Sequence, residues 1–315
     1  MYKYLLVSFI FLLSTGILYA DDKRLYQHLQ DVSVTVKASG GEGSGVIVTR
    51  AVSISADDKD KPTTIKVNFV WTAAHVVDGL RSVRTVIKDG RSIKIIEFKD
   101  AQIVQELVED GRRVGEMKME AKVIKNSDSE NGEDLALLMI RKKGYIDKSV
   151  TFFKAEGKPV PIGTELYHVG SLLGQTGSNS MTRGICSQVG RVLDLGNGSG
   201  VVFDQTTVTA FPGSSGGGVF LSERSCDHAG QYVGMLVRGA GETFNLIVPI
   251  RRMRAYAKKE GILWAIDSDC TTPSLQEITS MSIEGSKSST NRGAKATKDA
   301  FKFPVLPLIK DKLKK

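Results

Sequence analysis

Short runs of β-branched and aliphatic residues recur along most of this 315-residue chain, separated by glycine, asparagine and aspartate. Examples are "DVSVTVKA", "GSGVIVTR", "TIKVNFVWTA" and "YVGMLVRG". Runs of this kind between turn residues are typical of β-strands, and a long series of them favours a barrel or a sandwich. About a dozen strands are more than one small barrel needs, so the sequence predicts an all-β protein built from two packed barrels.

The segment "KKGYIDKSVTFFK" marks the expected break between the barrels. We therefore expect barrel one over about residues 31–147 and barrel two over about residues 148–250. Apolar residues at helical spacing predict a short helix in "LYQHLQDV" and a C-terminal helix over about residues 249–262. The charged segments 54–64 and 104–120 are predicted to be loops.

The first 20 residues, "MYKYLLVSFIFLLSTGILYA", have an early basic residue, an apolar centre and a small residue, Ala20, at the end. This order is typical of a secretory signal peptide, with cleavage before Asp21. The apolar stretch is interrupted by Ser8 and is short for a membrane span, so an uncleaved anchor is the poorer alternative. The sequence thus predicts an exported protein, periplasmic or secreted, without a stable membrane span after cleavage.

Nearly all of the net charge of +8 lies at the C-terminal end. Nine basic and two acidic residues follow Ser286, whereas residues 21–286 carry no net charge. Residues 266–315 are predicted to be a basic, disordered tail. Such a tail can bind anionic surfaces, which makes a surface adhesin one alternative function. The neutral body gives no reason to expect nucleic acid as a partner.

Three cysteines are present, Cys186, Cys226 and Cys270, and none has a neighbour at metal-ligand spacing. No metal or cofactor is therefore expected. An exported protein can oxidise one pair of cysteines. Cys226 with Cys270 is the preferred guess, because both lie in loop-like sequence, but the pairing stays open.

The run "FPGSSGGGVF", residues 211–220, holds two serines and four glycines between strand-like segments. A flexible linker is the simplest interpretation of a Gly-Ser run. The flanking strands favour an ordered tight turn instead, in which glycine allows close backbone approach. A serine in such a turn is chemically useful only if the chain supplies a base for it.

Of the four histidines, His75 has the most telling position, at the end of the apolar run "VNFVWTAA". His28 lies in the expected N-terminal helix, His228 lies in a polar loop beside Cys226, and His168 within "LYHVG" is expected to be a packed strand residue. Asp134 directly precedes the apolar run "LALLMI", so its carboxylate is carried to the edge of a core, where it needs a donor. A strand cap is the simpler role for Asp134, and a calcium loop has the wrong ligand spacing.

His75, Asp134 and Ser215 stand in the order His, Asp, Ser, one of the known orders of a catalytic triad. A neutral imidazole can take the proton of a serine during attack, and an acid fixes the tautomer of that imidazole. Backbone N–H groups of a glycine turn can stabilise the oxyanion that forms.

The motifs "GSGVIV", "WTAAHVV", "DLALL", "RGICSQVGR", "PGSSGGGVF" and "IVPI" resemble, in order, those of trypsin-like serine proteases. The closest likeness is to the bacterial high-temperature-requirement (HtrA/Deg) branch, over about residues 42–255. The resemblance implies two six-stranded antiparallel β-barrels, within a protease domain at residues 21–265, with the site between them. It implies a serine endopeptidase acting on protein or peptide substrates through an acyl-enzyme. The residues after the C-terminal helix do not resemble a PDZ domain, so none is expected there.

By the same resemblance His75 is the general base, Asp134 the orienting acid and Ser215 the nucleophile, since Ser215 falls at the serine of G-x-S-G-G. The oxyanion hole is assigned to Gly213, Ser214 and Ser215. A catalytically silent binding or chaperone module is the alternative function. The substrate pocket is expected to consist of Thr209, Ala210, Phe211, Val237, Arg238 and Gly239. None of these six residues is acidic, which favours cleavage after small or medium apolar residues.

Overall fold

A computed structural model of the protein describes residues 24–39, 41–54, 63–88, 91–109, 112–129, 133–154, 158–174, 177–194, 200–239 and 243–284. The predicted signal peptide, residues 1–20, lies outside the described residues. The same holds for most of the charged segment 54–64 and for the part of the predicted tail beyond residue 284.

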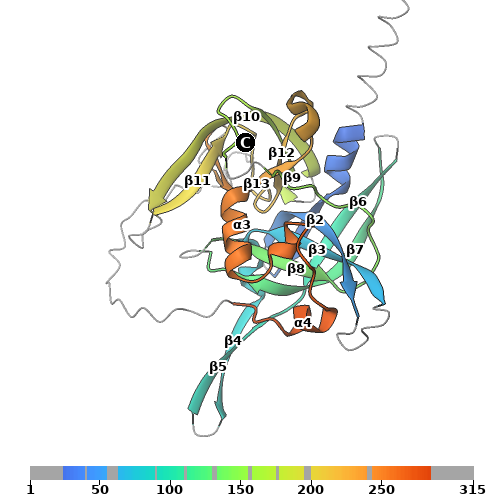
Figure 1. Ribbon diagram of the computed structural model, residues 1–315, viewed down its shortest axis with the longest axis vertical. Helices are drawn as coiled ribbons and strands as arrows, with labels where there is room; N and C mark the ends of the chain where they lie inside the picture. The colour runs from blue at the N-terminus through green and yellow to red at the C-terminus, as the bar shows by residue number, and fades with distance from the viewer. Residues whose placement is uncertain are drawn as a thin grey trace, which may run out of the picture.

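Twelve strands form two closed barrels (Figure 1), which confirms the predicted fold class. The first barrel has the order β1-β2-β3-β8-β7-β6 and the second β10-β11-β14-β13-β12-β9. Closure gives every strand a neighbour on both sides within its barrel. The strands are β1 Ser33–Ala38, β2 Gly41–Ser53, β3 Thr64–Thr72, β6 Ala101–Glu109, β7 Arg112–Asn126, β8 Ala136–Ile140, β9 Glu165–Leu172, β10 Gly177–Asp194, β11 Gly200–Thr206, β12 Gly218–Leu221, β13 Tyr232–Gly239 and β14 Asn245–Pro249.

The two barrels share one large hydrophobic core, and a smaller apolar cluster fills part of barrel two. Strand β8 is buried at all five residues, so its sequence is continuously apolar instead of alternating. Its neighbour β3 is covered on the outside by the C-terminal segment: Phe69 lies edge-on to Trp264, with ring centroids 4.9 Å apart. The Trp71 indole N–H donates to the Ala265 carbonyl at 3.3 Å.

The C-terminal segment lies beside both barrels and begins with α3, Ile250–Lys259. The helix ends a little earlier than expected, because Gly261 at φ +71° turns the chain. Two short helices follow, η4 at Leu263–Ala265 and α4 at Leu275–Ser280. Ser274 and Glu277 form a capping box at the start of α4, and Ile278 is fully buried. The prediction of a disordered tail is therefore wrong for residues 266–284.

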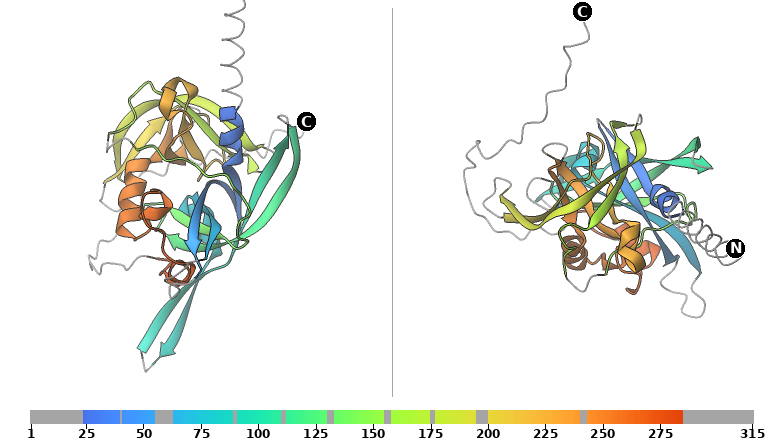
Figure 2. Two further views of the ribbon diagram at one scale, coloured as in Figure 1. Left: turned by 45° about the vertical axis from the view of Figure 1, so that its right-hand side comes forward. Right: turned by 90° about the horizontal axis from the view of Figure 1, so that it is seen from above.

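Two hairpins occupy sequence between β3 and β8. Of the segment 104–120, predicted to be a loop, residues 104–109 and 112–120 instead lie in the paired strands β6 and β7, whose outer ends are largely exposed. The β4–β5 hairpin, Arg81–Lys88 with Arg91–Phe98, forms a separate two-stranded sheet that projects from the body (Figures 1 and 2). Figure 2 shows this projection from a second direction.

Residues 24–31 form the predicted N-terminal helix. None of the described helices is long and apolar enough to cross a membrane. The three cysteines are free thiols, so the guessed pair of Cys226 with Cys270 is absent. Cys186 is buried in β10, and burial raises the pKa of its thiol to about 11.

Candidate active site

His75 lies in α2, Ala74–Val77, a single helical turn that begins just after β3. Ala73 and Ala74 are fully buried, and their small side chains let this turn lie close against the barrel. The His75 side chain itself is 37% exposed. The end of β3 thus places the imidazole of His75 at the protein surface.

Asp134 holds the imidazole of His75. The Nδ1 atom of His75 lies 2.9 Å from Oδ2 and 3.1 Å from Oδ1 of the carboxylate. The backbone N–H of His75 also donates to Asp134 Oδ1, at 3.0 Å. Because a carboxylate only accepts, Nδ1 carries the imidazole proton and Nε2 is left as an acceptor. Asp134 is 3% exposed, and the two N–H donors compensate for burying its charge.

A second carboxylate lies near this pair. Asp78 accepts a hydrogen bond from the Ser129 hydroxyl. Burial raises the pKa of Asp78, the nearby charge of Asp134 acts in the same direction, and the Ser129 hydrogen bond opposes both.

The two serines of the glycine-rich run differ in their surroundings. Ser214 is 1% exposed and closes a tight turn: its N–H donates to the Phe211 carbonyl at 2.9 Å, and its hydroxyl accepts from the Phe211 N–H at 3.1 Å. The Ser214 N–H, one of the three predicted oxyanion donors, is therefore already engaged. Ser215 is partly exposed, and its hydroxyl has no hydrogen-bond partner among the described residues.

The turn rests directly on barrel one. The Ser215 carbonyl accepts from the Ser44 N–H of β2 at 2.7 Å. Gly216 has φ +88°, and a Cβ there would lie 2.2 Å from the Ser44 carbonyl and 2.4 Å from the Thr72 hydroxyl. Only glycine fits such a close approach. This contact seats the residue after Ser215 against the end of β3, just before His75.

Two backbone N–H groups of the turn remain free. The Pro212 carbonyl accepts from the Leu173 N–H at 2.7 Å, so the N–H of the same peptide unit, that of Gly213, points the opposite way. The Ser214 carbonyl accepts a hydrogen bond within the turn, which likewise directs the Ser215 N–H outward. Neither N–H has an acceptor among the described residues.

The structure therefore brings His75 and Asp134 into contact and places Gly216, the residue after Ser215, against the end of β3. Among the described residues, no hydrogen bond joins the Ser215 hydroxyl to His75. Hydrogen bonds of this kind are often long in a free enzyme and shorten when substrate binds.

Ser44 is the residue of this site that the sequence analysis did not single out. Its hydroxyl donates to the Gly213 carbonyl at 2.7 Å and accepts from the Ser171 N–H at 2.7 Å. Its carbonyl accepts from the Thr72 hydroxyl at 2.7 Å. The motif "GSGVIV" contains Ser44, but only the fold reveals that one serine in barrel one holds the turn of barrel two.

His168 lies in β9 behind the same turn, fully buried as expected. Its Nδ1 lies 3.0 Å from the Gly218 carbonyl, and its Nε2 has no partner among the described residues. Burial lowers the pKa of His168 to about 4, and the hydrogen bond with Gly218 offsets part of the shift. His168 is therefore a neutral packing residue at physiological pH.

The first three predicted pocket residues precede the turn. The Thr209 carbonyl accepts from the Thr182 hydroxyl at 3.0 Å. Ala210 is partly buried against the apolar cluster of barrel two, and Phe211 is 45% exposed. Phe211 thus leaves apolar surface exposed at the turn.

The other three lie in β13. Val237 is 3% exposed. Gly239 leaves no room for a side chain, since a Cβ would lie 2.3 Å from Asn245 Oδ1. Arg238 donates from Nη2 to the Ser129 carbonyl of barrel one at 3.2 Å. The guanidinium therefore reaches across to the segment before Asp134.

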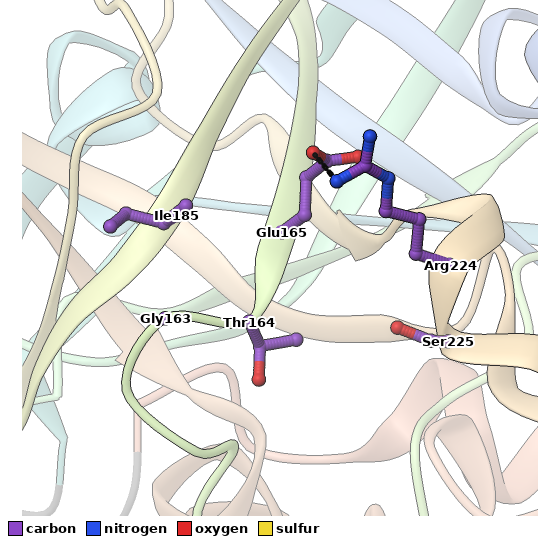
Figure 3. A pocket seen from close by; sticks show the side chains of 6 residues that line it. All are labelled: Gly163, Thr164, Glu165, Ile185, Arg224 and Ser225. Carbon is purple, nitrogen blue, oxygen red and sulfur yellow. Dashed lines mark ion pairs between the residues drawn. The ribbon is translucent and has the colours of Figure 1, made fainter.

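Figure 3 shows a pocket at a different place, lined by Gly163, Thr164, Glu165, Ile185, Arg224 and Ser225. Its carboxylate, Glu165, lies 3.7 Å from Arg224 Nη1 and also pairs with Arg183. The charge in this pocket is therefore already compensated, and no triad residue lines it. Groups of side chains able to hold a metal ion are absent from the described part of the chain.

A two-barrel fold with a His–Asp pair on one barrel and a serine in a glycine turn on the other defines the class of trypsin-like peptidases. The trypsin-like peptidase domain matches residues 43–235, and the chain belongs to this family. None of the curated proteins matches the sequence.

Solved structures of similar fold include Deg5, with 21% identity and a TM-score of 0.49, over 77% of this chain and 94% of that one. The inactive form of a serine-to-alanine mutant of Rv3671c from M. tuberculosis H37Rv is 17% identical, with a TM-score of 0.49, over 75% and 90% of the two chains. The apo MamO protease domain from Magnetospirillum magneticum is 17% identical, with a TM-score of 0.48, over 73% and 98%.

Proposed function

We propose that this protein is an exported serine endopeptidase that hydrolyses peptide bonds through an acyl-enzyme. The observation that carries the proposal is the contact of His75 with Asp134 beside the serine turn. In this role Asp134 keeps Nδ1 protonated, His75 Nε2 takes the proton of Ser215 as the hydroxyl attacks, and the imidazolium returns that proton to the leaving amine.

The two free N–H groups of Gly213 and Ser215 are the proposed oxyanion donors. Their peptide planes are fixed by hydrogen bonds of the carbonyls on the other side of each unit. Donors held in place before the reaction stabilise the developing charge without reorganisation. We leave Ser214 out of the oxyanion hole because its N–H is bonded to Phe211.

A substrate strand has a place to pair. Strand β12 pairs with β13 only as far as Met235, and Gly216 and Gly217 then bond to Leu236. Residues 237–239 therefore lack a strand partner on that side among the described residues. An extended peptide added there would run beside Ser215.

We propose that the residue before the scissile bond is small or medium and apolar. Phe211 presents apolar surface, and no acidic side chain is among the six predicted pocket residues. Arg238 is engaged with Ser129, which reduces its value as a counter-charge for an acidic substrate. Mapping cut sites in an unfolded protein mixture tests this; a dominant preference for lysine or arginine would contradict it.

Export is proposed from the pattern of residues 1–20 alone. N-terminal sequencing of the protein recovered from the periplasm or the medium should find Asp21 as the first residue. A cell-retained protein that starts at Met1 would overturn this part of the proposal.

Labelling with a fluorophosphonate probe tests the function directly. The purified protein should be labelled and should cleave unfolded protein, Ser215→Ala should do neither at a comparable rate, and Ser214→Ala should still react with the probe. A folded wild type that neither labels nor cleaves would instead support the alternative, a catalytically silent binding module.

A further inference from the structure

Asp134 has an unusual backbone conformation for its role. Its φ is +55°, in the left-handed region that non-glycine residues rarely adopt. The side chain is nevertheless buried and directed at His75. Something outside Asp134 must therefore favour this conformation over the ordinary one.

The chain on either side of Asp134 is tied down at its base. The Ser127 N–H donates to the Leu135 carbonyl at 2.9 Å, and the Leu135 N–H donates to the Ser127 hydroxyl at 2.9 Å. These bonds fix where the segment leaves β7 and enters β8. They do not reach the peptide unit between Glu133 and Asp134.

Arg252 of α3 binds that peptide unit. Its Nη2 donates to the Glu133 carbonyl at 3.2 Å, and its Nε pairs with the Glu133 carboxylate. Its Nη1 donates to the Val202 carbonyl at 3.2 Å, and the guanidinium carbon lies 4.8 Å from the centre of the Phe203 ring. The Arg252 side chain is only 10% exposed, and each of its three guanidinium nitrogens bonds to Glu133 or to Val202.

The position of the Glu133 carbonyl bears on Asp134 through simple geometry. The carbonyl belongs to the planar unit whose nitrogen is that of Asp134. The φ angle of Asp134 is the rotation of its Cα substituents relative to this plane. A fixed plane therefore limits the directions in which the carboxylate can point while β8 stays in place.

Arg238, also from barrel two, binds the other end of the same segment through the Ser129 carbonyl. The two arginines thus hold residues 129 and 133 from across the interface between the barrels. Both contacts are to main-chain carbonyls.

We propose that Arg252 is a positioning residue for catalysis: it acts through the Glu133 peptide to hold Asp134 in the left-handed conformation that orients His75. This inference rests on the proposed serine protease function, but its structural part can be measured without activity.

The test compares Arg252→Met with Arg251→Met. Arg251 lies next to Arg252 in α3 and pairs with Asp204 at 2.6 and 2.5 Å, entirely within barrel two. Rates are expressed per active site, counted by fluorophosphonate titration. Arg252→Met should lower kcat about five- to thirtyfold with KM unchanged. This range is the factor by which the free-energy cost of a left-handed backbone conformation would reduce the population of correctly oriented Asp134. Arg251→Met should keep the kcat of the wild type.

The low-field proton signal of the His75 Nδ1–H bonded to Asp134 gives the second readout. We expect it to be lost or broadened in Arg252→Met and kept in Arg251→Met. Arg252→Lys keeps the charge but offers one ammonium in place of a fork of donors, so its fall in kcat should be smaller. Glu133→Gln leaves the carbonyl contact intact and should change kcat by no more than about twofold.

Wild-type kcat per site and a wild-type proton signal in both Arg252→Met and Arg252→Lys would overturn the inference. The inference would also be overturned if the Arg252 variants lost total activity only because less of the protein is folded, with the same kcat per labelled site as the wild type. These outcomes differ from failure of the proposed function, in which the wild type itself neither labels nor cleaves.

Discussion

Removing the Ser44 hydroxyl should weaken both the fold and the active-site turn. In Ser44→Ala the Gly213 carbonyl and the Ser171 N–H lose their shared partner, each from a hydrogen bond of 2.7 Å. Ser44 and Ser171 are at most 1% exposed, so water does not replace the contact to the Ser171 N–H. Gly213 is partly exposed, and hydration there recovers part of the loss.

The size of the effect follows from these two groups. A buried polar group left without a partner costs about 1–3 kcal/mol. With the partial hydration of Gly213, we expect the free energy of unfolding to fall by about 2–4 kcal/mol. For a domain of this size each kcal/mol lowers Tm by about 2–4 °C. The peptide unit between Gly213 and Ser214, which links the two proposed oxyanion donors, should also be less firmly held, so kcat should fall.

Ser33→Ala is the matched control. Ser33 is equally buried, but its hydroxyl makes a single hydrogen bond, to the Leu29 carbonyl at 2.7 Å, away from the site. We expect a loss of about 1 kcal/mol and an unchanged kcat. Denaturant unfolding and peptide-hydrolysis kinetics measure both quantities. If Ser44→Ala matches Ser33→Ala in stability and in kcat, the assignment of Ser44 as the link between the barrels is refuted.

Gly216→Ala should lower both stability and kcat, because its Cβ would meet the Ser44 carbonyl at 2.2 Å; a wild-type Tm would contradict this. The free energy of unfolding should fall by roughly 3 kcal/mol as the pH drops from about 6.5 to about 4. In this range unfolded His168 binds a proton, whereas buried His168, with its pKa lowered to about 4, does not. In His168→Leu the free energy of unfolding should depend less on pH over the same range. An alkylating reagent should modify exposed Cys226 well before buried Cys186, whose pKa is raised to about 11; mass spectrometry showing equal rates in the native protein would be incompatible with the structure.

Local sequence was enough for the all-β fold class, whereas the three proposed catalytic residues came from the resemblance to trypsin-like serine proteases. Short apolar runs between turn residues have the period of strands, and twelve barrel strands are found. Ser215 was separable from Ser214 by its place in the glycine run, and the turn contacts of Ser214 agree with this. These features depend on neighbours within a few residues, which the sequence displays directly.

Two segments were misjudged because their local composition is ambiguous. Residues 104–109 and 112–120 are charged, yet they lie in paired strands whose outer ends are largely exposed to water, so neither face has an apolar pattern. Helix α4 is only six residues long, too short for a helical period to stand out. Its burial depends on Ile278, a single apolar side chain that reaches the shared core.

The sequence by itself determined the residue types at the site: an imidazole after a buried strand, a carboxylate before another, and a serine in a turn that only glycines allow. Tertiary structure alone decided what holds them in place. Ser44 lies 169 residues from Gly213, and Arg252 lies 119 residues from Glu133. Contacts over such separations form only when the two barrels close and pack. No local sequence pattern specifies which distant carbonyl will accept a hydrogen bond from an arginine or a hydroxyl.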